Sequence, residues 1–155
     1  MNVHVNITGG ERMKEALSKI VNTKLAVKAG VPAGATTTDG KSIPKYAVYN
    51  EVGTAHIPPR PFMRDTVNNK QGDWKAFLES NVDYNNIQRD KCVSVMGVLG
   101  EVMVADIKQT IQKGDFIPNA SVTVRAKRRR GKSEPDHPLI DTGQMLESII
   151  SEVVK

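Results

Sequence analysis

The chain has 155 residues, of which 39% are hydrophobic and 25% are charged, and these values predict one soluble globular domain. Its formal net charge of +5 favours polyanionic neighbours without identifying one. The single Cys92 excludes an internal disulfide. The first residues lack the charged start and apolar run of a signal peptide, and no stretch is as long as a membrane span, so we expect no membrane partner.

The first part of the chain predicts two strands with a helix between them. Apolar and polar residues alternate over 2–7, the period of a half-buried strand. Thr8-Gly9-Gly10-Glu11 fits a capping box, so we expect a helix that begins there and ends near residue 24. Alternation returns over 25–31 and predicts a second strand, which Pro32 ends.

The next part predicts a loop followed by two helices. Residues 33–44 are small and polar, and predict a mobile loop or a hairpin tip that becomes ordered on contact. A short helix is expected over 45–51. The three prolines of residues 56–61 exclude regular structure there, and a further helix begins at about Pro61. Phe62, in the segment 58–64, has two interpretations, an anchor on a partner or a plug in the chain's own core.

The longest predicted element is a helix over 83–113, whose apolar residues recur at helical spacing and form one wide stripe. Thirty residues correspond to about 45 Å of helix. Gly97 and Gly100 lie three residues apart on it and permit another backbone to approach closely. That neighbour is either part of the same chain, in a crowded core contact, or another subunit. Gly114 marks the end of the helix.

A basic segment follows, within an expected irregular and mobile stretch over 115–138. The basic segment is 125–132, and six of its eight residues are cations. They are Arg125, Lys127, Arg128, Arg129, Arg130 and Lys132. Clustered cations attract phosphate backbones without regard to base sequence, and no aromatic residue lies among these to stack on bases. We therefore expect a loop whose cations face DNA or an acidic partner.

Asp141-Thr142-Gly143 follows two apolar residues, and this pattern has two interpretations. It occurs at the catalytic turn of aspartic proteases, where paired carboxylates share a proton. It also fits a helix start, with Asp141 as the N-cap. Only twelve residues follow Gly143 and no second such triplet exists, which favours the cap. The three histidines lack the spacing of metal ligands, so we predict no metal site. We also predict no catalytic residue and no cofactor.

Four segments resemble the motifs of bacteriophage neck and tail-completion proteins. Residues 50–54, Asn-Glu-Val-Gly-Thr, and 57–64, Ile-Pro-Pro-Arg-Pro-Phe-Met-Arg, resemble that family's Asn-Glu-Phe-Gly-Thr and Pro-x-Arg-Pro-Phe-Leu/Met-Arg. Residues 138–149 resemble its closing Pro-Leu-x-Asp-Thr-Gly-x-Leu-x-x-Ser-Ile, and 29–34 resemble its Val-Gly-Ile/Val-Pro strand end. Val52 departs from the pattern, because an aromatic residue is more usual there.

The resemblance implies a structural virion protein made late in infection, without catalysis. Such proteins form homo-oligomeric rings, with a hexamer favoured, around the channel through which double-stranded DNA passes. The neighbours would be head-connector, tail-terminator or tail-tube proteins, and the location the virion neck or tail after assembly in the host cytoplasm. The alternative is a small basic DNA-binding protein that uses Arg125–Lys132, with a retropepsin-like protease at Asp141 as a third hypothesis.

The implied fold is α+β, with a small antiparallel or mixed sheet packed against a long central helix and a shorter N-terminal helix. The sheet would hold an N-terminal strand, the strand near 25–31 and a C-terminal strand. Residues 148–154 fit either a helical face or a strand, and the resemblance favours the strand. It also gives Asp141 and Thr142 the role of a structural cap, and makes Arg60 and Arg64 candidates for subunit contacts or carboxylate pairing. The structural or interface residues that it implies are Asn50, Glu51, Gly53, Thr54, Pro59, Arg60, Pro61, Phe62, Arg64, Pro138, Leu139, Asp141, Thr142, Gly143 and Ser148.

Overall fold

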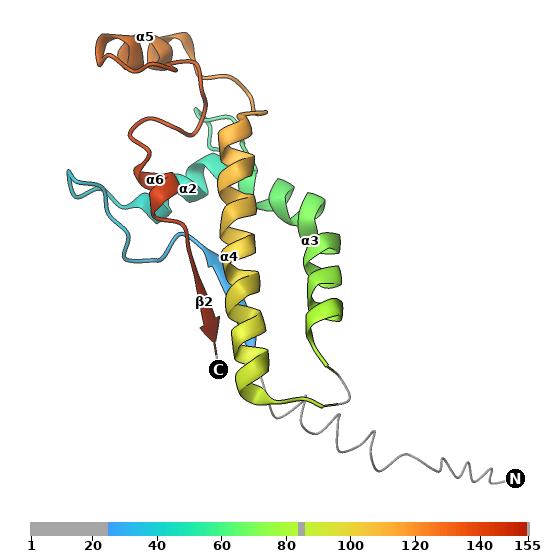
Figure 1. Cartoon of the computed structure of the whole chain (residues 1–155). Coiled ribbons are helices and arrows are strands. Elements are labelled where there is room, and N and C mark those ends of the chain that lie inside the picture. The colour runs from blue at the N-terminus through green and yellow to red at the C-terminus, as the bar shows by residue number, and fades with distance from the viewer. Residues whose placement is uncertain (1–24, 84–85, 155) are drawn as a thin grey trace, which may run out of the picture.

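The computed structural model describes residues 25–83 and 86–154, and these ranges contain two strands and five helices. In chain order the elements are β1 (Ala26–Gly30), α2 (Ile43–Val52), α3 (Phe62–Asn81), α4 (Arg89–Lys113), α5 (Ser121–Arg129), α6 (Gln144–Glu147) and β2 (Ile150–Val154). The long helix α4 is central, with α3 along one side and the strands along the other (Figure 1). The α+β class is therefore confirmed. The strand and helix predicted before residue 25 lie outside the described residues.

The sheet joins the two ends of the described chain. Its strands are antiparallel, with Ala26 opposite Val154 and Gly30 opposite Ile150. The last segment is therefore a strand, which resolves the ambiguity between strand and helix. Alternate residues of each strand are half-buried against α4, as expected when only one face of a sheet is covered.

Helix α4 begins six residues later than predicted and ends where predicted, at Gly114 with its left-handed φ of 68°. Its 25 residues correspond to about 38 Å. A Cβ on Gly100 would lie 2.8 Å from the Cβ of Ser151 and 3.1 Å from Cγ2 of Val27. Gly100 thus lets the sheet of the same chain approach α4, which confirms the interpretation as a crowded core contact. A Cβ on Gly97 would have no neighbour within 4 Å in residues 25–83 and 86–154.

The main core lies where α2, α4, α6 and the start of α3 meet. Its buried side chains are those of Ile43, Ala47, Phe62, Val104, Ile107, Ile111, Met145 and Ile149. Phe62 is only 1% exposed, so it fills the chain's own core and does not anchor a partner. Helix α3 is further tied to α4 because the indole Nε1 of Trp74 donates to Oδ2 of Asp106 over 2.8 Å. In the described part of the chain, no helix is long and apolar enough to cross a membrane.

The two segments expected to be irregular differ in outcome. Residues 31–42 form a loop, closed by a bridge between Thr36 and Ser42. The stretch 115–138 was wrongly predicted to be irregular throughout, because it contains α5. Helix α5 lies at the far end of the molecule, beyond the end of α4 (Figure 1). Its arginines, lysine and alanine are good helix formers, and no glycine or proline interrupts them before Gly131.

Candidate functional site

Residues 50–64, which include the first two resembling segments, form and stabilise the start of α3. The Glu51 carboxylate accepts hydrogen bonds from the backbone N–H groups of Met63, over 2.9 Å, and Arg64, over 3.1 Å. It also lies 3.2 Å from the Arg64 Nε, which confirms Arg64 as a partner of a carboxylate. A negative charge at a helix N-terminus satisfies free N–H groups and is stabilised by the helix dipole. Pro61 occupies the N-cap position itself, where no side-chain cap is formed.

A tight turn returns the chain from α2 to α3. Gly53 has a φ of 78°, and a Cβ there would lie 3.0 Å from both the Ile57 carbonyl oxygen and the Pro59 ring. Both the positive φ and the lack of space for a Cβ require glycine at this position. The Thr54 hydroxyl oxygen accepts from the backbone N–H of Ile57 over 3.1 Å. The turn brings Arg60 back beside the end of α2.

Arg60 ties this segment to the residues that follow α4. Its side chain is 6% exposed, and its Nε donates to the Ile117 carbonyl over 2.8 Å. Nη1 donates to Oδ1 of Asn50 over 3.1 Å. Nη2 donates to the Pro118 carbonyl over 3.2 Å and to Oδ1 of Asn119 over 3.4 Å. All these partners are neutral, so carboxylate pairing was wrong for Arg60, and burial lowers the pKa of the guanidinium.

Lys127 was predicted to face DNA or a partner, and this prediction was wrong. The residue is only 4% exposed, and its Nζ donates to the carbonyl oxygens of His137, over 2.7 Å, and Ile140. The pKa of Lys127 is lowered, first by desolvation and also by the cations of Arg130 and Arg60. The physical reason for the error is the helix: a basic run folded into α5 has an inner face, which holds Lys127.

Asp141 is also placed differently from the prediction. Its Oδ2 accepts from Nη1 of Arg130 over 2.8 Å, while Oδ1 is buried without a hydrogen-bond partner among the described residues. The N-cap of α6 is Gly143, with φ 80° and no side-chain cap, so Asp141 and Thr142 do not cap this helix. Leu139 has a φ of 65°, which is costly for a residue with a Cβ.

The other residues of the closing motif fix the path of this segment. Pro138 is buried, and the His137 ring before it contacts the Gln112 carbonyl at the end of α4 over 2.9 Å. The Ser148 hydroxyl donates to the Met145 carbonyl over 2.8 Å and ends α6. The closing motif is thereby attached to α4 on one side and to the core on the other.

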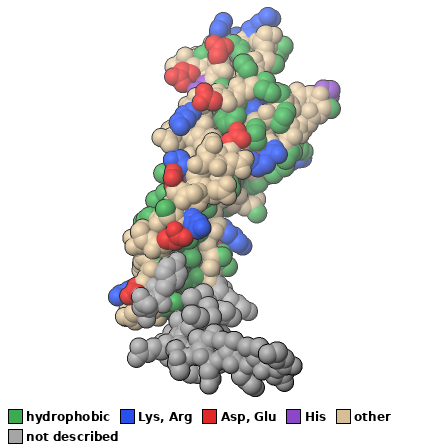
Figure 2. All heavy atoms as spheres, turned by 90° about the vertical axis from the view of Figure 1, so that its right-hand side faces the viewer, with side chains coloured by type: hydrophobic (Ala, Val, Ile, Leu, Met, Phe, Trp, Pro, Cys, Tyr) green, Lys and Arg blue, Asp and Glu red, His purple; other side chains and the backbone are tan. Residues whose placement is uncertain are grey.

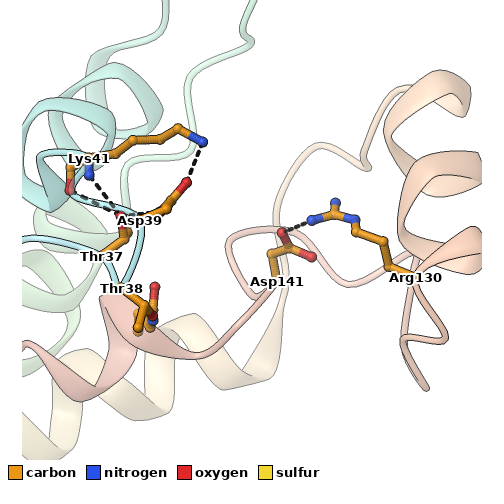
Figure 3. A network of polar contacts seen from close by, with 7 residues as sticks. Thr37, Thr38, Asp39, Lys41, Arg130 and Asp141 are labelled. Carbon is orange, nitrogen blue, oxygen red and sulfur yellow. Dashed lines mark hydrogen bonds and ion pairs between the residues drawn. The ribbon is translucent and has the colours of Figure 1, made fainter.

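These segments enclose a cleft of about 520 Å³. Its residues come from the loop 37–41, from α2 and Arg60, from the inner face of α5, and from 139–145. Figure 3 shows the two walls, with Asp39 and Lys41 on the loop facing Asp141 and Arg130 across the opening. The Gln144 amide donates to the Thr38 hydroxyl and connects the walls at one end.

Comparison of the chain with protein families, with curated proteins and with solved structures finds no match in any of the three. The candidate site is therefore described from the residues that line the cleft. Two carboxylates and four cationic side chains line the cleft, a set suited to holding a polar or charged group.

The outer face of α5 carries the remaining basic residues. Arg125 and Arg129 are exposed, and neither side chain has a hydrogen-bonding partner among the described residues. Lys132 is half-buried, and Arg128 lies 3.5 Å from Asp136 in an exposed ion pair. Figure 2 shows Lys and Arg side chains at this end of the molecule. The exposed basic surface therefore contains fewer cations than the six that the sequence predicted.

Asn119 is a site residue that the sequence did not reveal. Its Nδ2 donates to the His137 carbonyl over 3.0 Å while its Oδ1 accepts from Arg60. It thus joins the two motif segments through one side chain. An asparagine after a proline, in a stretch without periodicity, carries no signal that distinguishes this role from an ordinary turn residue.

Proposed function

We propose that the chain is a structural virion protein, a tail-completion or neck protein that forms a ring at the head–tail junction of a tailed phage. The supporting observation is that the resembling segments, distant in sequence, form one connected framework. Arg60 bonds to Asn119, and Asn119 bonds to the closing segment at His137. Glu51 from the first segment starts α3. The motif residues therefore act mainly on the architecture of the protein, as expected of a building block.

An exposed apolar face on α2 supports an oligomer. Val48 is 56% exposed, Tyr49 39% and Val52 60%, and none of them joins the core. Contiguous apolar side chains on a surface are typical of contacts between proteins. Val52, which stands where the resembling family has an aromatic residue, is part of this exposed face. In the proposed ring, with a hexamer favoured, this face packs against the next subunit or a neighbouring ring of head-connector, tail-terminator or tail-tube protein.

The proposal is tested in a phage that encodes the chain. Disruption of the coding sequence is expected to yield DNA-filled heads and separate tails under the electron microscope, because joining requires the ring. Supply of the intact chain from a plasmid should restore joined particles. Normal yields of joined particles without the chain would reject the proposal.

A second candidate is a small DNA-binding protein, which the outer face of α5 favours. Arg125 and Arg129 lie four residues apart on one helix face and are exposed. Such cations bind phosphates without reading bases. This binding is also compatible with a ring around double-stranded DNA, so the two candidates differ in whether particles fail to join when the chain is missing.

A further inference from the structure

Two buried cations lie in the wall of the cleft, and among the residues that the structure describes no carboxylate is bonded to either. Arg60 is 6% exposed and Lys127 4% exposed, and both line the cleft. Within the described part of the chain, the side-chain hydrogen bonds of Arg60 go to three carbonyl or amide oxygens of the segment 117–119 and to Oδ1 of Asn50. Those of Lys127 go to two backbone carbonyls. Buried Lys and Arg are usually paired with an anion, because an uncompensated charge in low dielectric is costly.

The exposed charges of the cleft do not supply that anion. Asp39 lies 2.6 Å from Nζ of Lys41, and Asp141 lies 2.8 Å from Nη1 of Arg130. The carboxylate on each wall is thus neutralised by a cation of the same wall (Figure 3). Four cations against two carboxylates leave a net charge of +2, which belongs to the buried pair. Burial is the main cause of the lowered pKa of Lys127; the Asp141 carboxylate opposes this shift, and the cations of Arg130 and Arg60 add to it.

The cleft also contains an acceptor that lacks a donor. Oδ1 of Asp141 is buried and has no hydrogen-bond partner within the described ranges. A buried acceptor of this kind is rare and is destabilising when it stays unpaired. An occupant that completes the cleft therefore brings an anion for the buried cations together with an N–H or O–H for Asp141.

We propose that the cleft binds an acidic peptide segment, with a carboxylate side chain facing Arg60 and Lys127 and a backbone N–H donating to Oδ1 of Asp141. A peptide has both groups in adjacent positions. A DNA phosphodiester has no donor, and two phosphates would meet Asp39 and Asp141 on the walls. The cleft volume of about 520 Å³ accommodates a few residues of such a segment. The proposal concerns the isolated chain and does not depend on a role in a phage.

Binding is measured by calorimetry with the full chain and a peptide blocked at both ends, Gly-Glu-Gly-Glu-Gly, against its counterpart with glutamine in place of glutamate. The glutamate peptide is expected to bind at least about tenfold more tightly, since charge-assisted hydrogen bonds are about twice as strong as neutral ones. Amide shifts in nuclear magnetic resonance spectra should map to Thr142 and Gly143. Equal affinities of the two peptides, or no binding of either at millimolar concentration, would overturn the proposal.

A matched pair of variants locates the site. Arg130→Gln removes a cation that lines the cleft, and Arg125→Gln removes one from the outer face of the same helical region. The first is expected to weaken the glutamate peptide about tenfold and the second less than about twofold. Lys127→Met should abolish binding, with circular dichroism to check its fold. Equal losses for Arg130→Gln and Arg125→Gln, or displacement of the peptide from the cleft by duplex DNA, would contradict the proposed occupant.

Discussion

The Nε of Arg60 donates to the carbonyl oxygen of Ile117 over 2.8 Å, which joins two residues 57 positions apart in the sequence. The bond connects the segment before α3 to the segment after α4. Because Arg60 is buried and its partners are neutral, its main effect is on folding.

Arg60→Lys is expected to lower the free energy of unfolding by about 2–3 kcal/mol, because lysine keeps the charge but cannot reproduce the fork that reaches four acceptors. Urea denaturation followed by circular dichroism measures this loss. The control is Arg129→Lys at an exposed position, where the change should stay within about 0.5 kcal/mol. A loss at Arg60 as small as that of the control would show that these bonds do not hold the segments together.

Glu51→Ala is expected to destabilise the start of α3, because the N–H groups of Met63 and Arg64 lose their acceptor. The expected cost is about 1–2 kcal/mol, the usual range for loss of a helix cap. Glu79→Ala, in the exposed ion pair with Lys75 on the same helix, is the matched control and should cost less than about 0.5 kcal/mol. If both variants unfold at the same urea concentration, Glu51 is not a cap.

Gly97→Ala and Gly100→Ala are expected to change stability in opposite directions. A Cβ on Gly97 meets no other described residue, so alanine should add about 0.5–1 kcal/mol of helix propensity. A Cβ on Gly100 would lie 2.8 Å from Ser151, so overpacking should cost about 1–3 kcal/mol. Thermal denaturation of both variants tests the contact between α4 and the sheet. Stabilisation by Gly100→Ala would contradict this close approach.

Asp39 should titrate unusually low for a surface carboxyl. Hydrogen bonds from Lys41, first, and Thr37 lower its pKa from 3.8 to about 2. Because the folded pKa lies below the unfolded one, the contribution of Asp39 to stability is complete above pH 3.8 and is lost as pH falls through about 2. Carbon-detected nuclear magnetic resonance should give this midpoint, and Lys41→Gln should move it back towards 3.8. An unchanged midpoint in the variant would reject the ion pair as the cause.

DNA binding by the isolated chain should depend on salt less steeply than six cations imply. Lys127 is buried and Arg130 is paired with Asp141, which leaves at most four outward cations. At about 0.9 per phosphate, the slope of log affinity against log salt should be about −3 to −4. Fluorescence anisotropy with a duplex measures it, and Arg125→Gln should reduce the slope by about one. A slope near −5 would mean that the buried lysine also reaches DNA.

The sequence predicted those parts of the fold that have a period or a marked boundary. Helix α4 was predicted from its stripe and from Gly114, and β1 from its alternation. Helix α5 was missed because its run of cations was interpreted as a solvated loop, although arginine and lysine are good helix formers. The inward position of Lys127 was missed for the same reason, since only the folded helix shows which face of a basic run is covered.

The candidate site could be predicted only in part. The sequence singled out the motif residues Glu51 and Arg60 but did not predict their partners, because many of these are backbone groups that no sequence pattern marks. Asp141 was expected to cap a helix, and its pairing with Arg130 depends on how 139–142 folds around the left-handed Leu139. The cleft arises from segments that meet only in the folded chain.

The most direct test of the proposed role is the position of the chain in finished particles. Purified virions of the phage that encodes it are labelled with antibodies against the chain, coupled to gold, and viewed by electron microscopy. The account predicts label at the head–tail junction, including the tail end in particles whose heads have been removed. Label on the capsid shell or on tail fibres, or virions that lack the chain altogether, would contradict it.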